Sequence, residues 1–145
     1  MFDNILVVCV GNICRSPTGE QLLKKYTTSK KVTSAGIQAL VGHSADKTAE
    51  IIASENGLCL SGHHARQLTP SMCRGHDLIL VMEKNHYHAV CSIAPEVRGK
   101  IMLYGHWIGK RDIPDPYRMS EAVFRSVYQL LDSSAQKWAQ HLIAN

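Results

Sequence analysis

The sequence predicts an α/β fold with a single doubly wound, four-stranded parallel sheet and helices on both faces. Short continuous apolar runs, such as residues 5–8 and 78–82, alternate along the chain with longer segments of helical periodicity. Runs that are apolar on both faces are typical of parallel strands covered by helices on both sides. A loop over residues 9–16 joins the first run to the first helical segment, and ligands bind in such sheets beyond the carboxyl ends of the strands.

The first strand, residues 4–8, leads through this loop into the first helix. Ser16 suits the N-cap position and Pro17 the first helical position. Glu20 is then expected in the first turn, where a carboxylate favours the helix dipole. We expect this helix to end near Lys25.

The second strand is expected over residues 32–35 and is followed by a loop and a second helix. That helix begins at Asp46 and stops at the C-cap pattern of Asn56 and Gly57. The next segment reads as irregular, with a short helix over residues 70–74.

The third strand, residues 78–82, is followed by a helix over residues 83–94 that Pro95 ends. A fourth strand covers residues 101–104, and a long loop then leads to a final helix that starts near Ser120. The apolar stripe of that helix follows a helical period: Val123, Val127, Leu130 or Leu131, Ser134, Trp138 and Leu142.

Length and composition restrict the class of protein. The 145 residues fit one domain, 1–145, with 45% hydrophobic and 19% charged residues. The formal charge of +4 comes from scattered Lys and Arg, so we expect no nucleic-acid partner, although it would attract an anionic substrate. The sequence lacks a membrane-spanning apolar run and a signal peptide, which predicts a cytoplasmic protein with no membrane insertion.

The five cysteines and eight histidines do not form a disulfide framework or a zinc site in the sequence. Five is an odd number, and neither residue type shows the spacing of a tetrahedral site. We therefore expect no metal and no cofactor, and read Cys59, Cys73 and Cys91 as structural.

The loop after the first strand predicts a phosphate-binding site with a nucleophile. Inward N–H groups, the helix N-terminus and Arg15 would all favour the thiolate of Cys9. Arg15 can hold two phosphate oxygens, and the Ser16 hydroxyl can donate to the thiolate. The loop itself is formed by Val10, Gly11, Asn12, Ile13, Cys14 and Ser16. Gly11 allows a close backbone approach, and Asn12 tolerates the left-handed conformation.

Phosphoryl transfer to sulfur needs an acid for the leaving oxygen, and Asp115 is the candidate. It lies between Pro114 and Pro116, which stiffen its loop, and it follows the fourth strand. As a carboxylate it could afterwards take a proton from the hydrolytic water.

Cys14 has two open interpretations. It packs as a small hydrophobic side chain, or the curled loop brings its sulfur near Cys9, so that oxidation gives a reversible protective disulfide.

These residues resemble the low-molecular-weight protein tyrosine phosphatases over essentially the whole chain. The motif of that family is a nucleophilic cysteine, five residues, arginine and serine, with an Asp-Pro acid loop late in the chain. Residues 9–17 and 115–117 carry the motif, and residues 33–36, 63–67 and 77–82 also match.

The resemblance implies a supporting network and a substrate pocket. It implies that Ser34 and His63 hold Asn12. Eukaryotic members place aromatic residues where this chain has Leu40 and Arg118, so the pocket walls are expected to be Ile13, Leu40 and Tyr117.

Residues 8–18, 39–42 and 105–107 resemble the enterobacterial members of the family. Those members act on the tyrosine-rich tails of membrane-bound autokinases that control exopolysaccharide or capsule production. The resemblance therefore implies a phosphotyrosine protein of this kind as partner, and we expect a monomer.

Three alternatives compete with this interpretation. A thioredoxin-coupled arsenate reductase of the same fold needs two further, closely spaced cysteines, whereas Cys73 and Cys91 are far apart. A protein-arginine phosphatase of the family prefers threonine where Ile13 stands. A non-catalytic phosphotyrosine-binding module would lack the nucleophile or the acid, and both are present.

Overall fold

The computed structural model, which describes residues 2–143, has a parallel sheet with strand order β2-β1-β3-β4. The strands are β1 (Asn4–Cys9), β2 (Lys31–Gly36), β3 (Leu78–Val81) and β4 (Ile101–Leu103). The helices are α1 (Arg15–Tyr26), α2 (Lys47–Glu55), α3 (Pro70–Arg74), α4 (Lys84–Ile93) and α5 (Glu121–Ile143). Two 3₁₀ turns, η1 (Pro95–Lys100) and η2 (His106–Ile108), complete the order. The predicted doubly wound α/β fold is confirmed.

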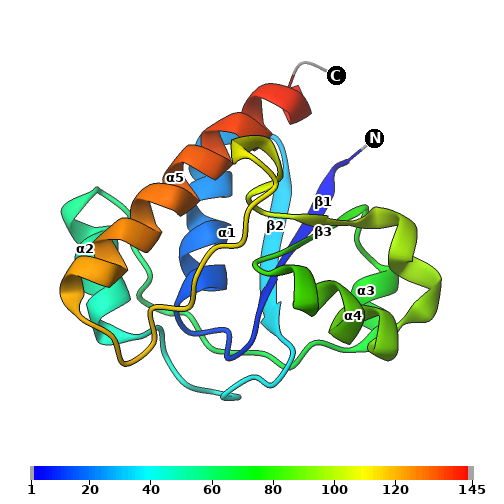
Figure 1. Ribbon diagram of the computed structural model, residues 1–145, viewed down its shortest axis with the longest axis horizontal. Coiled ribbons are helices and arrows are strands. Elements are labelled where there is room, and N and C mark those ends of the chain that lie inside the picture. Colours follow the sequence, from blue (N-terminus) through cyan, green and yellow to red (C-terminus); the bar gives the residue numbers. More distant parts are fainter. Residues whose placement is uncertain (1, 144–145) are drawn as a thin grey trace.

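Two hydrophobic cores lie on opposite faces of the sheet. Ile5 and Val7 of β1 belong to the core with α1, α2 and α5, whereas Leu6 and Val8 belong to the core with α3 and α4. Figure 1 shows the corresponding layers, with α1, α2 and α5 on one side and α3 and α4 on the other. Because alternate side chains of a strand point to opposite faces, the continuous apolar run of β1 is explained by burial on both faces.

The strand order reverses beside β1. From β1 the chain crosses to β2 on one side and later returns to β3 on the other. The loop after β1 therefore lies at the switch point, where such sheets bind ligands.

The start of α1 differs from the prediction. The helix begins at Arg15, and its N-cap is Cys14, which makes no side-chain capping bond. Ser16 lies inside the first turn, and its hydroxyl is bonded to Cys9 and Asn12 and does not cap the helix. Glu20 is not in the first turn, and its carboxylate accepts from Ser34 and Lys24.

The other helices and strands agree with the prediction to within one or two residues at their ends. The 3₁₀ turn η1 fills the segment between α4 and β4, and η2 lies in the long loop expected after residue 104. In α5, the buried members of the predicted stripe include Val127, Leu131 and Trp138. Within the described residues, no helix combines the length and apolarity needed to cross a membrane.

The end of β4 is fixed by buried polar bonds to two helices. The Tyr104 hydroxyl donates to the Gly19 carbonyl of α1 at 2.9 Å. The Trp138 indole of α5 donates to the Tyr104 carbonyl, also at 2.9 Å. These bonds fix the point at which the chain leaves the sheet towards Asp115.

Candidate active site

The loop after β1 is held from outside through five consecutive carbonyl groups. These carbonyls accept hydrogen bonds as follows: Cys9 from Ile37 N, Val10 from Gln38 N, Gly11 from Leu40 N, Asn12 from His63 Nε2 and Ile13 from Asp46 N, at 2.6–3.1 Å. In a trans peptide the carbonyl and the following N–H point in opposite directions. The N–H groups of residues 10–14 therefore point to the inner side of the loop, and none of them donates to an acceptor within residues 2–143. This arrangement is a cradle for an anion.

The Cys9 thiol lies at this cradle. Its side chain is 3% exposed, and its Sγ is 2.9 Å from Ser16 Oγ. The Asn12 amide donates to the same Ser16 oxygen at 2.7 Å. Since that bond occupies the oxygen as an acceptor, the Ser16 hydroxyl hydrogen is available to donate to the sulfur, which stabilises a thiolate.

Asn12 is the residue through which the rest of the fold fixes the cradle. It is fully buried and has a φ of +60°, in the left-handed region. Its amide also donates to Ser34 Oγ at 3.0 Å, and its Oδ1 accepts from the Arg66 backbone N–H at 2.9 Å. The Ser34 hydroxyl in turn donates to Glu20 at 2.6 Å. The structure thus brings Ser34 and His63 to Asn12 and adds Arg66 and Glu20, which the sequence did not indicate.

Arg15 lies between the cradle and the loop that carries Asp115. It is 2% exposed, and its Nη1 donates to Glu83 Oε2 at 2.5 Å and to the Ile113 carbonyl at 2.7 Å. Its Nη2 is 3.7 Å from Asp115 Oδ2. The guanidinium orientation is therefore fixed by partners on two further segments of the chain.

Glu83 was missed in the sequence, although a signal was available. It comes directly after the apolar run of β3, at the same carboxyl edge as Cys9. A charged side chain at that position of a parallel sheet is well placed to contact a ligand or one of its binding residues.

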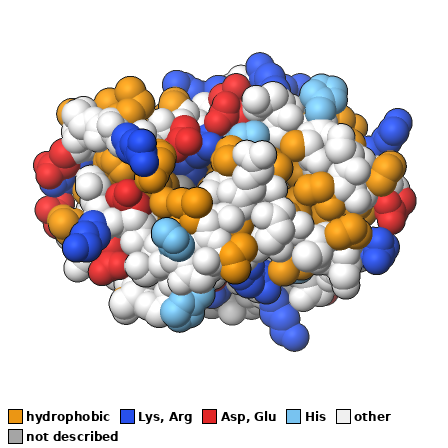
Figure 2. All heavy atoms as spheres, turned by 90° about the horizontal axis from the view of Figure 1, so that it is seen from below, with side chains coloured by type: hydrophobic (Ala, Val, Ile, Leu, Met, Phe, Trp, Pro, Cys, Tyr) orange, Lys and Arg blue, Asp and Glu red, His pale blue; other side chains and the backbone are white. Residues whose placement is uncertain are grey.

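The pocket above the cradle has a volume of about 180 Å³. Its lining residues are Cys9, Val10, Gly11, Ile13, Cys14, Arg15, Gln38, Leu40, Asp115 and Tyr117. Leu40 and Tyr117 are partly exposed, as expected for walls at a mouth. Figure 2 looks onto the carboxyl edge of the sheet, where hydrophobic and charged side chains lie side by side.

A thiol, an anion cradle and a carboxyl group in one pocket agree with the comparisons with known proteins. A family model for low molecular weight phosphotyrosine protein phosphatase matches residues 4–145. The phosphatase Wzb of Escherichia coli K12 is 58% identical over 144 residues, which is 99% of this chain and 98% of that protein.

The chain belongs to the low molecular weight phosphotyrosine protein phosphatase family.

Solved structures of relatives agree with this assignment. Wzb from Escherichia coli K30 in complex with sulphate has a TM-score of 0.96 and 55% identity, covering 98% of this chain and 99% of that one. Wzb of Vibrio vulnificus in complex with benzylphosphonate has a TM-score of 0.96 and 54% identity, covering 97% of this chain and 99% of that one. The arginine phosphatase YwlE of Geobacillus stearothermophilus shares the fold, with a TM-score of 0.92, covering 99% of this chain and 94% of that one. Its sequence identity to this chain is only 28%. The phosphotyrosine phosphatase reading is thus favoured over the alternatives.

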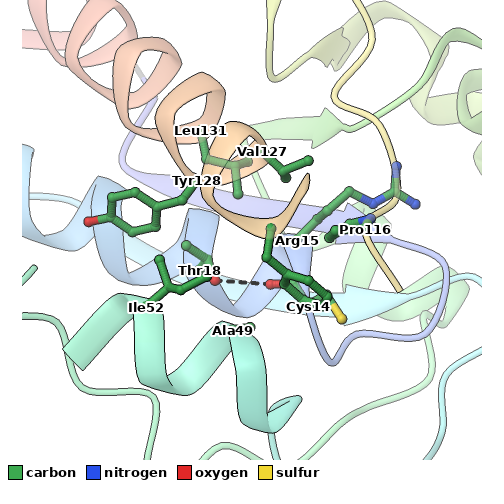
Figure 3. A pocket seen from close by; sticks show the side chains of 10 residues that line it. Cys14, Arg15, Thr18, Ala49, Ile52, Pro116, Val127, Tyr128 and Leu131 are labelled. Carbon is green, nitrogen blue, oxygen red and sulfur yellow. Dashed lines mark hydrogen bonds between the residues drawn. The ribbon is translucent and has the colours of Figure 1, made fainter. Parts of the chain in front are cut away.

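Cys14 of this phosphatase lies between the pocket and a smaller cavity behind it. Burial, followed by the nearby Asp46 carboxylate, raises the pKa of its thiol. Figure 3 shows the cavity between α1, α2 and α5, with the Thr18 hydroxyl donating to the Cys14 carbonyl at 3.0 Å. Its volume of about 10 Å³ is close to that of a single water. The cavity is therefore no substrate site.

Proposed function

We propose that the protein hydrolyses phosphotyrosine in two steps, with Cys9 as the nucleophile. The observation that carries this proposal is the cradle: five inward N–H groups and a buried arginine beside one thiol. Such donors stabilise the phosphoryl oxygens most strongly in the transition state, since they are aligned before the substrate arrives.

In the first step the Cys9 thiolate attacks phosphorus in line, forming an S–P bond as the bond to the tyrosine oxygen breaks. Asp115 gives its proton to that oxygen and becomes a carboxylate. In the second step Asp115 takes a proton from water, whose oxygen attacks the cysteinyl phosphate and releases inorganic phosphate. The thiolate is restored, and its departure is eased by the Ser16 hydroxyl.

The apolar walls support an aromatic phosphate ester as substrate. Ile13, Leu40 and Tyr117 line the pocket above the thiol. A protein-arginine phosphatase would present threonine at position 13, according to the resemblance. An arsenate reductase would need a thiol relay to Cys9, yet Cys73 is fully buried in the core on the other face of the sheet.

The direct test is phosphate release from a phosphotyrosine peptide, with a reductant and EDTA present. We expect turnover by the native protein, and none by Cys9→Ser, which should still bind inorganic phosphate. Absence of turnover by the native protein under these conditions would contradict the proposal. Substantial activity of Cys9→Ser would show that another residue is the nucleophile.

Asp115→Asn tests the acid separately. It should slow phosphotyrosine peptides about 100-fold, and slow an ester with a very good leaving group much less. Equal slowing of both substrates would remove Asp115 from this role.

We further propose that the substrate in the cell is the tyrosine-rich tail of a membrane-bound autokinase that controls exopolysaccharide or capsule production. This proposal rests on the resemblance to the enterobacterial members. It places the protein in the cytoplasm, where the five free cysteines, including the reactive Cys9, stay reduced. A Cys9→Ser trap in lysate should capture a phosphorylated autokinase, and capture of other phosphoproteins in its place would contradict the assignment.

Cys14 is proposed as a redox partner of Cys9, because both thiols line the same pocket. Peroxide would convert Cys9 to a sulfenic acid, and attack by Cys14 sulfur would release water and form a disulfide. Dithiothreitol should then restore the native protein even after prolonged exposure to peroxide, because the disulfide protects Cys9. In Cys14→Ser the same exposure should oxidise the Cys9 sulfenic acid further to a sulfinic acid, which dithiothreitol does not reduce. If mass spectrometry finds no Cys9–Cys14 linkage, this role is wrong.

A further inference from the structure

A second groove lies between β4 and α4, outside the pocket described above. It has a volume of about 500 Å³ and a mainly apolar lining. The lining residues are Val81, Lys84, Tyr87, His88, Ile101, Met102, Leu103 and His106. Lys84, Tyr87 and His88 stand three and four positions apart, so they share one face of α4.

The outer side of β4 is an open sheet edge. Strand β4 pairs with β3 alone among the described strands. The Tyr104 N–H donates to the Val81 carbonyl, so it points towards β3. Because N–H groups alternate along a strand, those of Ile101 and Leu103 point away from the sheet, into the groove.

A groove between an edge strand and a helix is a geometry in which proteins bind extended peptides by strand addition. The backbone edge supplies hydrogen bonds, and the apolar floor accepts alternate side chains. The basic lining residues are Lys84, His88 and His106, and the lining contains no Asp or Glu. This lining therefore suits a peptide that carries both aromatic and acidic groups.

We propose that the groove between β4 and α4 docks an extended, acidic, tyrosine-containing segment of the same substrate whose phosphotyrosine enters the pocket. The proposal rests on the phosphotyrosine hydrolysis proposed above and adds a second contact. A tyrosine ring would pack on Ile101 and Leu103. A carboxylate or phosphate would pair with Lys84.

The groove and the pocket are close enough for one peptide. Strands β1, β3 and β4 are consecutive in the sheet, so the carboxyl ends of β1 and β4 are about 10 Å apart at normal strand spacing. Lys84 follows Glu83, whose carboxylate holds Arg15. About three to five extended residues would connect the two sites.

A kinetic comparison tests the proposal. One probe is a five-residue peptide with a single phosphotyrosine. The other two are the same peptide extended by eight residues of tyrosine and glutamate, at either end, because a strand can add in either direction. We expect at least one extended peptide to have a kcat/KM about tenfold higher, through a lower KM.

The double variant Lys84→Glu, His88→Glu should abolish that gain and leave the short peptide unchanged. Both side chains are exposed, so the variant is expected to fold. Lys137→Glu, an exposed charge reversal on α5, is the matched control and should keep the gain. Equal kcat/KM for short and extended peptides, or a gain that survives in the double variant, would overturn the docking site.

A binding measurement separates this proposal from the proposed activity. The unphosphorylated extension alone is titrated into labelled Cys9→Ser protein and followed by NMR. Amide shifts at Ile101 and Leu103 are expected, and shifts confined to residues 9–16 would refute the site. If the short phosphopeptide is not hydrolysed at all, the proposed function fails, whatever binds in the groove.

Discussion

The cradle and the loop that carries Asp115 face the same pocket but are fixed in different ways. The cradle is buried and bonded to four other segments through its carbonyl groups and through Asn12. The Asp115 side chain is 47% exposed. Its Oδ1 accepts from the Tyr117 N–H, and the neighbouring Pro116 carbonyl accepts from the Met119 N–H, so both bonds stay within the loop.

The difference fits the role proposed for each half. Stabilising a phosphoryl group requires several dipoles to be aligned in advance, because reorienting them during the reaction would cost free energy. A proton donor makes one hydrogen bond to the leaving oxygen. It has to come within hydrogen-bond distance of that oxygen, and it needs less rigid support than the cradle. A substitution in the cradle should therefore lower activity and stability more than a substitution in the acid loop.

The largest effect is expected for Arg15→Lys, because Arg15 contacts both halves. Lysine cannot bind two phosphate oxygens in a planar fork and cannot keep both the Glu83 and Ile113 bonds in the same geometry. We expect kcat/KM for a phosphotyrosine peptide to fall about 1000-fold. Arg66→Lys retains the backbone bond to Asn12 and serves as the control. A loss below tenfold in Arg15→Lys would contradict the proposed role.

Asn12→Ala should be next, since it removes three side-chain hydrogen bonds. It also places alanine at a positive φ, which alanine tolerates less well than asparagine. The free energy of unfolding should fall by about 3 kcal/mol, and kcat/KM about 100-fold. The matched change in the acid loop is Asp112→Ala, which removes the bond to the Lys84 N–H. For Asp112→Ala, urea denaturation should show that the free energy of unfolding falls by less than about 1 kcal/mol. Equal decreases in the two variants would contradict the difference between the cradle and the acid loop.

A pH effect is expected from His86, which lies beside Glu83 where the two halves meet. Burial, followed by the positive charge of Arg15, lowers the pKa of His86 below its usual 6.5. Below pH 6.5 the unfolded chain then binds more protons than the folded one, so stability falls as the pH falls through this range. The slope should not exceed about 1.4 kcal/mol per pH unit for this group.

The measurement is urea unfolding between pH 7.5 and 5.5, with His86→Gln as the comparison. Glutamine can still accept from the Glu83 N–H, as His86 Nδ1 does at 3.2 Å. The variant should lose less stability on acidification. Burial also lowers the pKa of His106, so a residual slope should persist. Identical slopes in the two proteins would show that His86 does not contribute.

The smallest effect is expected for Pro114→Ala. Proline at this position restricts the acid loop in the unfolded chain as well as in the folded one. Its loss should therefore change the free energy of unfolding by less than about 1 kcal/mol. Turnover of a phosphotyrosine peptide should slow about two- to fivefold, with little change for an ester that has a very good leaving group. A large loss of stability would mean that the acid loop is held as firmly as the cradle.

The sequence by itself determined the fold, the loop after β1 and the candidate acid. These depend on local signals: apolar runs, helix periodicity, the spacing of Cys9 and Arg15, and an aspartate between two prolines. The family resemblance added Ser34 and His63, which residue patterns alone did not mark.

Only the tertiary structure decided what holds the site together. Glu83, Arg66 and Glu20 are distant in sequence from the groups that they bond, so no local pattern reveals them. Ser16 shows the same limit, because its hydroxyl fits an N-cap by sequence and bonds the Cys9 thiol in the fold. The physical reason is that a hydrogen bond depends on the distance and angle between two atoms, and for these pairs the packing of the helices on the sheet sets both.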